Sequence, residues 1–97
     1  MAPLSEDEVS AALSEYDDWE QAVSYLRKKV KFAKFADGVA AVAKVAEKAD
    51  AANHHPDIEI HSDEVTFTLS THSEGGITQK DLDLAKEIDG IVKDQKS

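Results

Sequence analysis

Four histidines are the side chains best suited to chemistry in this sequence. His54 and His55 are adjacent and precede Pro56, whereas His61 and His72 stand apart, near the ends of apolar stretches. Imidazole has an unperturbed pKa of about 6.5, so it can donate or accept a proton near neutral pH. These residues therefore predict general acid and general base catalysis in a cleft formed where secondary-structure elements end.

Each histidine also has an interpretation without catalysis. His61 could be an ordinary surface residue, and His72 could be a loop residue with no further role. The pair His54 and His55 could cap the C-terminus of a helix, where the helix dipole favours positive charge. The spacing alone leaves both interpretations open.

Other kinds of site fit the sequence less well. Histidines and carboxylates could hold zinc, but neighbouring residues rarely bind one ion together and the HExxH pattern is absent. Cysteine is absent, which excludes disulfides and thiolate nucleophiles, and there is no Gly-x-Ser-x-Gly elbow. We therefore expect chemistry that uses imidazole and carboxylate, with no metal ion and no cofactor.

The charge of the chain excludes further classes of function. The 97 residues include 20 Asp and Glu against 11 Lys and Arg, which gives a formal charge of -9. Five of the 11 cations gather between Arg27 and Lys34, too small a positive field for binding nucleic acid. No segment approaches the ~20 apolar residues of a membrane span, and the acidic N-terminus does not resemble a signal peptide. The sequence predicts a single cytoplasmic domain over residues 1–97 that binds neither nucleic acid nor membrane.

Two helices are expected ahead of the histidine pair. Ser5 and Glu8 form a capping box in front of a helix predicted over Glu6–Tyr16. The segment Ala36–Ala52 contains eight alanines, and alanine is the strongest helix former. A helix face built from such small residues can lie close against a sheet.

Alternating apolar and polar residues predict four strands. The clearest is Leu26–Phe32, in which Lys28 is the residue that does not fit the alternation. Trp19–Val23 is expected to pair with it. Ile58–Ile60 and Val65–Ser70 form a second predicted pair, joined by a tight turn.

A last helix is expected after Thr78, which is a good N-cap residue, with Asp81 at the third helical position. Its end, Lys93–Ser97, is expected to fray. The order of elements predicts an α+β fold: an N-terminal helix followed by two β-β-α units, with a four-stranded antiparallel sheet and helices packed on one face.

Two motifs and one acidic position resemble a known family. The residues are Val45–Pro56, which ends in Asn-His-His-Pro; Val65–His72, which ends in Ser-Thr-His; and Asp81. They resemble the pterin-4a-carbinolamine dehydratase family, also called 4a-hydroxytetrahydrobiopterin dehydratase, and the resemblance extends over about Trp19–Val92. It implies that His54, His55 and His72 are catalytic residues lining a pocket for the pterin ring.

The resemblance also implies roles for neighbouring residues. An acidic residue one turn before the first histidine corresponds to Asp50, which we expect to orient or polarise His54. Backbone groups near Ser70 and Thr71 are expected to hold the hydrogen-bonding edge of the pterin. Asp81 could bind substrate or act as a helix cap. The substrate-binding residues expected are Asn53, Pro56, Ser70, Thr71 and Asp81.

Two positions depart from the family pattern. Ile58 and Ser62 stand where aromatic residues are common in the family. Loss of a ring that could stack on the pterin would weaken its binding or change which pterin is accepted. The histidines are intact, so activity is expected to survive.

The function implied is dehydration of a 4a-hydroxytetrahydropterin to quinonoid dihydropterin in tetrahydrobiopterin recycling. An acid must protonate the departing hydroxyl and a base must take a ring N–H proton, and imidazoles can do both. The alternative is a non-catalytic dimerisation module that binds a protein partner. In either case we expect a homodimer or homotetramer, formed by Val65–Ser70 adding to a neighbour's sheet or by contacts between helices.

Overall fold

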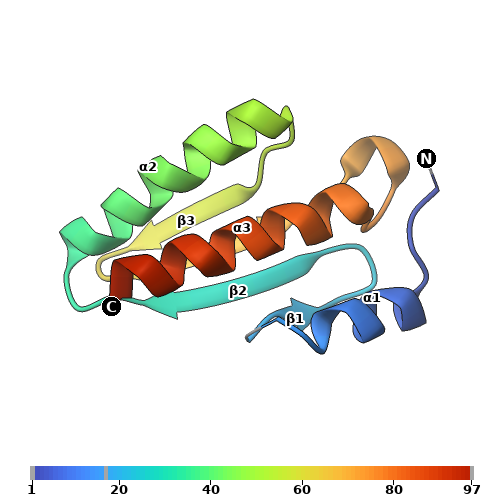
Figure 1. Ribbon diagram of the computed structural model, residues 1–97, viewed down its shortest axis with the longest axis horizontal. Coiled ribbons are helices and arrows are strands. Elements are labelled where there is room, and N and C mark those ends of the chain that lie inside the picture. The colour runs from blue at the N-terminus through green and yellow to red at the C-terminus, as the bar shows by residue number, and fades with distance from the viewer. Residues whose placement is uncertain (1, 17, 97) are drawn as a thin grey trace.

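The computed structural model describes residues 2–16 and 18–96. These residues form three helices, a short 3-10 turn and four strands, and Figure 1 shows how they are arranged. The helices are α1 (Glu6–Leu13), α2 (Phe35–Ala52) and α3 (Gln79–Lys96), and the 3-10 turn is η1 (His72–Glu74). The strands are β1 (Glu20–Gln21), β2 (Leu26–Lys31), β3 (Asp57–His61) and β4 (Glu64–Leu69).

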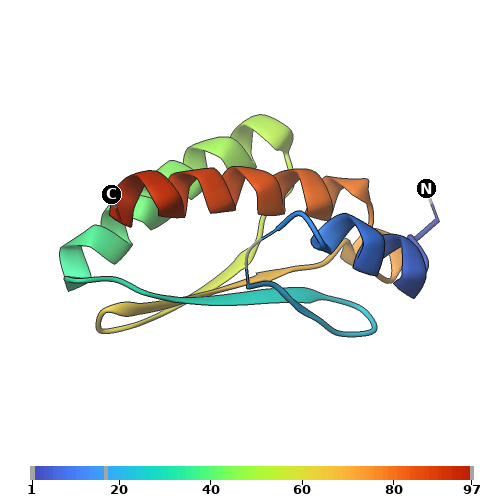
Figure 2. The ribbon, with the colours of Figure 1, turned by 60° about the horizontal axis from the view of Figure 1, so that its bottom comes forward.

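The four strands form one antiparallel sheet in the order β1-β2-β4-β3. Figure 2 shows the helices stacked on one side of this sheet, with α2 and α3 crossing it and α1 near the start of α3. The predicted α+β fold with an N-terminal helix and two β-β-α units is confirmed. The core lies between the sheet and α2 and α3.

Small residues on α2 allow it to lie close to the sheet, as predicted. Ala41 and Val45 are fully buried against the strands. A Cβ atom at Gly38 would lie only 3.0 Å from Cγ2 of Val65 on β4. The sheet contributes large apolar side chains to the same layer, and Phe67 and Leu26 are completely buried. Burial of each such side chain stabilises the fold by about 1.5–3 kcal/mol.

The N-terminal helix begins as predicted and ends early. Ser5 Oγ accepts the amide of Glu8, and the Glu8 carboxylate accepts the amide of Ser5, which completes the capping box. The helix ends at Leu13, three residues before the predicted end, and the residues from there to Tyr16 form turns. β1 is likewise shorter than the predicted Trp19–Val23, since only Glu20 and Gln21 pair with β2.

Lys28, the residue that breaks the alternation of β2, points into the helix side of the sheet. Its Nζ lies 2.7 Å from Oδ1 of Asp89 on α3, and only 8% of the lysine side chain is exposed. Trp19 Nε1 donates to the same carboxylate oxygen at 2.8 Å. A buried charge is tolerated when it is paired in this way, so the departure from the pattern has a structural reason.

Two expectations about the edges and ends are wrong. β4 lies between β2 and β3, so both of its edges are already paired and it cannot add to a neighbour's sheet. The last helix does not fray at Lys93, because α3 continues to Lys96; Ser97 lies outside the described residues. Among the described residues, no helix combines the length and the apolar character needed to cross a membrane.

Candidate active site

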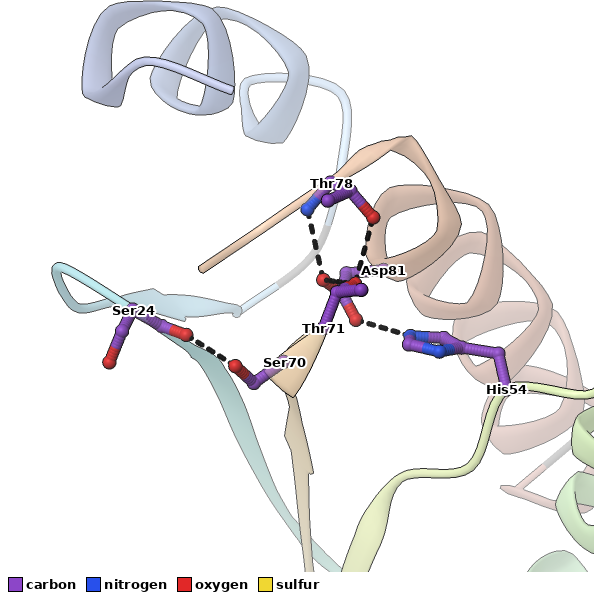
Figure 3. A network of polar contacts seen from close by, with 6 residues as sticks. All are labelled: Ser24, His54, Ser70, Thr71, Thr78 and Asp81. Atoms are coloured by element: carbon purple, nitrogen blue, oxygen red, sulfur yellow. Dashed lines mark hydrogen bonds and ion pairs between the residues drawn. The ribbon is translucent and has the colours of Figure 1, made fainter. Parts of the chain in front are cut away.

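The end of α2 directs His54 toward the start of α3. Asn53 follows the helix with a left-handed backbone (φ 52°), a conformation that asparagine adopts more readily than most residues. The chain therefore leaves the helix axis, and His54 lies across the first turn of α3. Its Nε2 is 2.6 Å from Oδ1 of Asp81 (Figure 3).

Asp81 is completely buried, and both of its oxygens are hydrogen-bonded. Oδ2 accepts the hydroxyl of Thr71 at 2.8 Å and the amide of Thr78 at 3.0 Å. The hydroxyls of Thr71 and Thr78 are themselves 2.8 Å apart. Because the Thr71 hydroxyl donates its hydrogen bond to the carboxylate, the Thr78 hydroxyl is the donor in the bond between the two threonines. The network joins the end of β4, the start of α3 and the segment after α2 (Figure 3).

This network fixes the tautomer of His54. An ionised carboxylate only accepts hydrogen bonds, so the Nε2 atom that faces Asp81 must carry a proton. The other nitrogen, Nδ1, then has a lone pair whenever the ring is neutral. Nδ1 has no hydrogen-bond partner among the described residues, and no side-chain nitrogen or oxygen is both buried and unpaired. Nδ1 is therefore accessible from outside.

A groove of about 500 Å³ begins at His54 and runs between α2 and α3. Its walls combine apolar and charged side chains. The lining residues are Lys48, Ala51, Ala52, His54, Lys80, Asp83, Leu84 and Glu87. A ligand in this groove would contact an imidazole whose orientation is fixed from behind by a buried carboxylate.

Asp50 does not contact His54, contrary to the sequence-based expectation. Its Oδ1 lies 2.9 Å from Nε2 of His55, and both side chains are exposed. The expectation assumed that the helix continues to His54, which would place residues 50 and 54 on one face. The helix ends at Ala52, and Asn53 has a left-handed backbone. Because the chain changes direction there, His55 contacts Asp50 and His54 contacts Asp81.

His72 lies in a different cavity. It is the first residue of η1, which follows β4 after Ser70 and Thr71, and it is exposed. This second cavity, of about 430 Å³, is lined by Ser24, Tyr25, Asp57, Thr68, Ser70, His72 and Gly75. The groove at His54 and the cavity at His72 have no lining residue in common. The chain thus brings together His54 with Asp81, and His55 with Asp50, but not all three histidines in one pocket.

Ser70 and Thr71 are engaged within the chain. The Ser70 hydroxyl donates to the carbonyl of Ser24 at 2.7 Å. The Thr71 amide donates to the carbonyl of Gly76 at 2.9 Å, and the Thr71 carbonyl accepts from Glu74. Thr71 therefore contributes to the site through its hydroxyl, which holds Asp81. Contacts of either residue with a pterin stay a prediction.

The two departures from the family pattern lie in different places. Ile58 on β3 is half-buried and packs against the core. Ser62 occupies the β3-β4 turn with a left-handed backbone (φ 57°). The five residues of β3 separate this turn from His55, a span of roughly 15 Å. The missing ring at Ser62 is therefore remote from His55 of the same chain.

Sequence reasoning missed the hydroxyl of Thr78 and the lysines of the groove. Thr78 was expected only as an N-cap, and its hydroxyl instead supports Thr71. Lys80 belongs to no motif, and Lys48 lies within Val45–Pro56 but was given no role there. Among residues 2–16 and 18–96, no group of three or more histidine or acidic side chains is arranged to hold a metal ion.

Comparison with known proteins identifies the family of this chain. A sequence model of the family described as pterin 4 alpha carbinolamine dehydratase matches residues 2–91. A protein of Mycobacterium sp. (strain JLS), provisionally named as a pterin-4-alpha-carbinolamine dehydratase, is 58% identical over 92 residues, covering 95% of this chain and 98% of the relative. A relative of the same provisional name from Mycobacterium avium (strain 104) is 53% identical over the same share of each chain.

Solved structures agree with the sequence comparisons. The crystal structure of a transcriptional coactivator/pterin dehydratase from Brucella melitensis superposes with a TM-score of 0.89 at 30% identity, covering 93% of this chain and 98% of that one. A pterin dehydratase-like RuBisCO assembly factor of the alpha-carboxysome shares the fold, with a TM-score of 0.63 at 19% identity over 76% of this chain and 86% of that one. From the family match and the near full-length identities, this chain belongs to the pterin-4a-carbinolamine dehydratase family, a family of hydro-lyases.

Proposed function

We propose that this chain dehydrates a 4a-hydroxytetrahydropterin by acid-base catalysis, with His54 as the proton-accepting residue. The observation that carries the proposal is the contact between His54 Nε2 and the buried carboxylate of Asp81. A base must present a lone pair to the substrate, and the Asp81 contact leaves that lone pair on Nδ1. The family membership supplies the substrate class.

The chemistry needs two proton transfers. The C4a–O bond breaks as an acid protonates the hydroxyl, which leaves as water. A base removes the proton of a ring N–H, and the ring becomes quinonoid dihydropterin. Each transfer is typically worth ~10²- to 10⁴-fold in rate. We assign the base to His54 and the acid to His55, with Asp50 positioning His55. His72, which lines a separate cavity, is the third catalytic histidine that the family resemblance implies.

The pocket for the pterin is proposed at the groove beside His54. The adjacent side chains of Ala51, Ala52 and Leu84 offer apolar surface for a flat ring, and charged groups at the rim can bind its polar edge. Such a mixture of apolar walls and few polar groups is typical of small-molecule sites. Asn53 and Pro56 hold the segment that carries the histidines, and we propose that they shape one end of this pocket.

Single substitutions of the histidines test the proposal. His54→Ala, His55→Ala and His72→Ala are each expected to slow dehydration of synthetic 4a-hydroxytetrahydropterin at least tenfold. His61→Ala is the matched control, because His61 is 81% exposed at the far end of β3. Unchanged rates in the His54 variant would refute its assignment as base, and unchanged rates in all three would refute histidine catalysis.

A role in tetrahydrobiopterin recycling is proposed with this activity, in a cytoplasmic homodimer or homotetramer. The outer edge of β3 and the exposed Phe35 and Val39 on α2 are surfaces through which copies could pair. Light scattering of the purified protein tests the assembly. A single-chain mass at micromolar concentration would contradict it.

The same apolar side chains favour a second candidate function, an interaction module for another protein. Phe35 is 56% exposed and Val39 41% exposed, one turn apart on α2. Exposed apolar groups in one place are typical of protein contacts. The two functions differ in one measurement, since an interaction module alone would show no acceleration of dehydration in the stopped assay.

A further inference from the structure

The outer edge of β2 is unpaired over more than half of its length. β1 pairs only with Leu26 and Arg27, so the stretch from Lys28 to Lys31 has no strand beside it on that side among the described residues. Figure 1 shows β2 continuing past the short arrow of β1, beneath the C-terminal half of α3. An exposed strand edge can accept a further strand.

The direction of the backbone groups along this edge follows from two hydrogen bonds. Phe32 donates its amide to the carbonyl of Asp63, on the β4 side. Ala22 donates to the carbonyl of Tyr25, on the β1 side. Since hydrogen-bonding direction alternates along an antiparallel strand, Lys29 and Lys31 direct both N–H and C=O to the open edge.

A groove of about 400 Å³ lies along this edge, between β2 and α3. Five of its nine lining residues are lysines, although the chain contains only 11 basic residues and has a charge of -9. The lining residues are Asp18, Lys28, Lys29, Val30, Lys31, Asp89, Val92, Lys93 and Lys96. The groove therefore concentrates positive charge on an acidic protein.

The acidic residues in and near the groove neutralise only part of this charge. Asp89 is occupied by Lys28 and by the indole of Trp19. Glu64 lies 3.9 Å from Lys29, an exposed pair that contributes little. Lys31, Lys93 and Lys96 form no ion pair among the described residues, and of the lining acids only Asp18 remains to oppose them.

Simpler roles account for part of this arrangement. Lysines on a free edge discourage pairing between two copies of the same strand, and lysines at the end of a helix complement its dipole. Neither role requires the arrangement at this edge, where Lys29 and Lys31 stand on the exposed face of β2 and Lys93 and Lys96 of α3 lie on its helix side. The same charges that repel a second copy of this edge attract a strand of opposite charge.

We propose that the groove between β2 and α3 binds an extended acidic peptide segment of another protein, which pairs with β2 as an added strand. A peptide fits better than a small anion, because the edge offers carbonyl acceptors as well as amide donors and a phosphate can use only the donors. The nearly buried Val30 and Val92 line the groove between the charges. The proposal is independent of the dehydratase activity.

The test uses a fluorescein-labelled peptide of four Glu-Val repeats, titrated with the full chain and followed by anisotropy. Binding is expected, together with slower amide exchange at Lys29 and Lys31, whose amides point to the open edge. A peptide of four Glu-Pro repeats has the same charge but cannot form a β ladder. It is expected to bind at least tenfold more weakly, as is inorganic tripolyphosphate.

Charge-reversed variants provide the matched comparison. Lys29→Glu with Lys31→Glu is expected to weaken binding by roughly tenfold or more. Lys44→Glu with Lys86→Glu makes the same change in net charge outside the groove and is expected to leave binding within about twofold. Absence of binding, equal binding of the Glu-Pro peptide or of tripolyphosphate, or equal loss in both variants would each overturn the proposal.

Discussion

Replacing Asp81 with asparagine removes a charge, and the geometry predicts that it also changes the tautomer of His54. The carboxylate accepts three hydrogen bonds, one at Oδ1 from His54 and two at Oδ2 from Thr71 and Thr78. Asparagine has one oxygen and one NH₂ group, so only one of these two sides can keep an acceptor. In the variant, the asparagine oxygen can face either His54 or the pair Thr71 and Thr78, but not both.

The choice follows from the amide of Thr78, which cannot reorient. If the asparagine NH₂ faced this buried amide, two donors would oppose each other, at a cost of about 1–3 kcal/mol. The oxygen is therefore expected to face Thr71 and Thr78, and the NH₂ group to face Nε2 of His54. Nε2 must then accept, so the proton moves to Nδ1 and the proposed base loses its lone pair.

The expected result is a fall of ~10²- to 10⁴-fold in the dehydration rate, the usual worth of a general base, with the fold retained. The ¹⁵N shifts of the His54 ring are expected to change from a protonated Nε2 to a protonated Nδ1. Glu59→Gln, the same chemical change at an exposed site on β3, is the control and should alter neither. A rate within threefold of the unmodified protein, or an unchanged tautomer, would refute the reasoning.

Two further predictions concern stability. Asp89→Ala removes the carboxylate that both Lys28 and Trp19 contact, so the free energy of unfolding is expected to fall by roughly 2–4 kcal/mol in urea titrations. Lys28→Met combined with Asp89→Leu should recover most of this loss, and an equal loss in the double variant would contradict the pairing argument. The hydrogen bonds from Ser5 hold the pKa of the Glu8 carboxyl below its usual 4.5. The capping box therefore stabilises the fold at pH values above 4.5, and this stabilisation is lost as the pH falls through the pKa of Glu8 in the folded protein. NMR titration should place Glu8 below 4.5, and Ser5→Pro, which removes both the amide donor and the hydroxyl, should return it toward 4.5; no change would contradict the assignment.

The fold was predictable because its elements repeat simple patterns. Alternation marked β2, the alanines marked α2, and the capping box marked the start of α1. Lys28 shows where a local pattern stops being informative, because its partner Asp89 is 61 residues away along the chain. The predicted length of β1 was wrong for a similar reason. Strand pairing depends on where the segment lies relative to β2 and not only on its own residues.

The candidate site was predictable in its residues but not in its pairs. The motif identified His54, His55 and Asp50, and helical periodicity then joined Asp50 to His54. A single left-handed residue, Asn53, reverses that assignment. One backbone angle at the end of a helix decides which carboxylate reaches which imidazole, and no spacing rule that assumes continued helix can find it.

The sequence left open whether Asp81 binds substrate or caps a helix, and the structure shows it capping α3 and contacting His54. Its two oxygens have different partners. Oδ2 accepts a hydrogen bond from the amide of Thr78 and caps α3, whereas Oδ1 is hydrogen-bonded to the ring of His54. The two roles depend on each other. A buried carboxylate already fixed by the cap and by Thr71 cannot turn away from the histidine, so the imidazole is oriented by bonds that also stabilise the helix. This coupling predicts that substitutions of Asp81 which spare the cap, as asparagine does, will separate loss of catalysis from loss of stability.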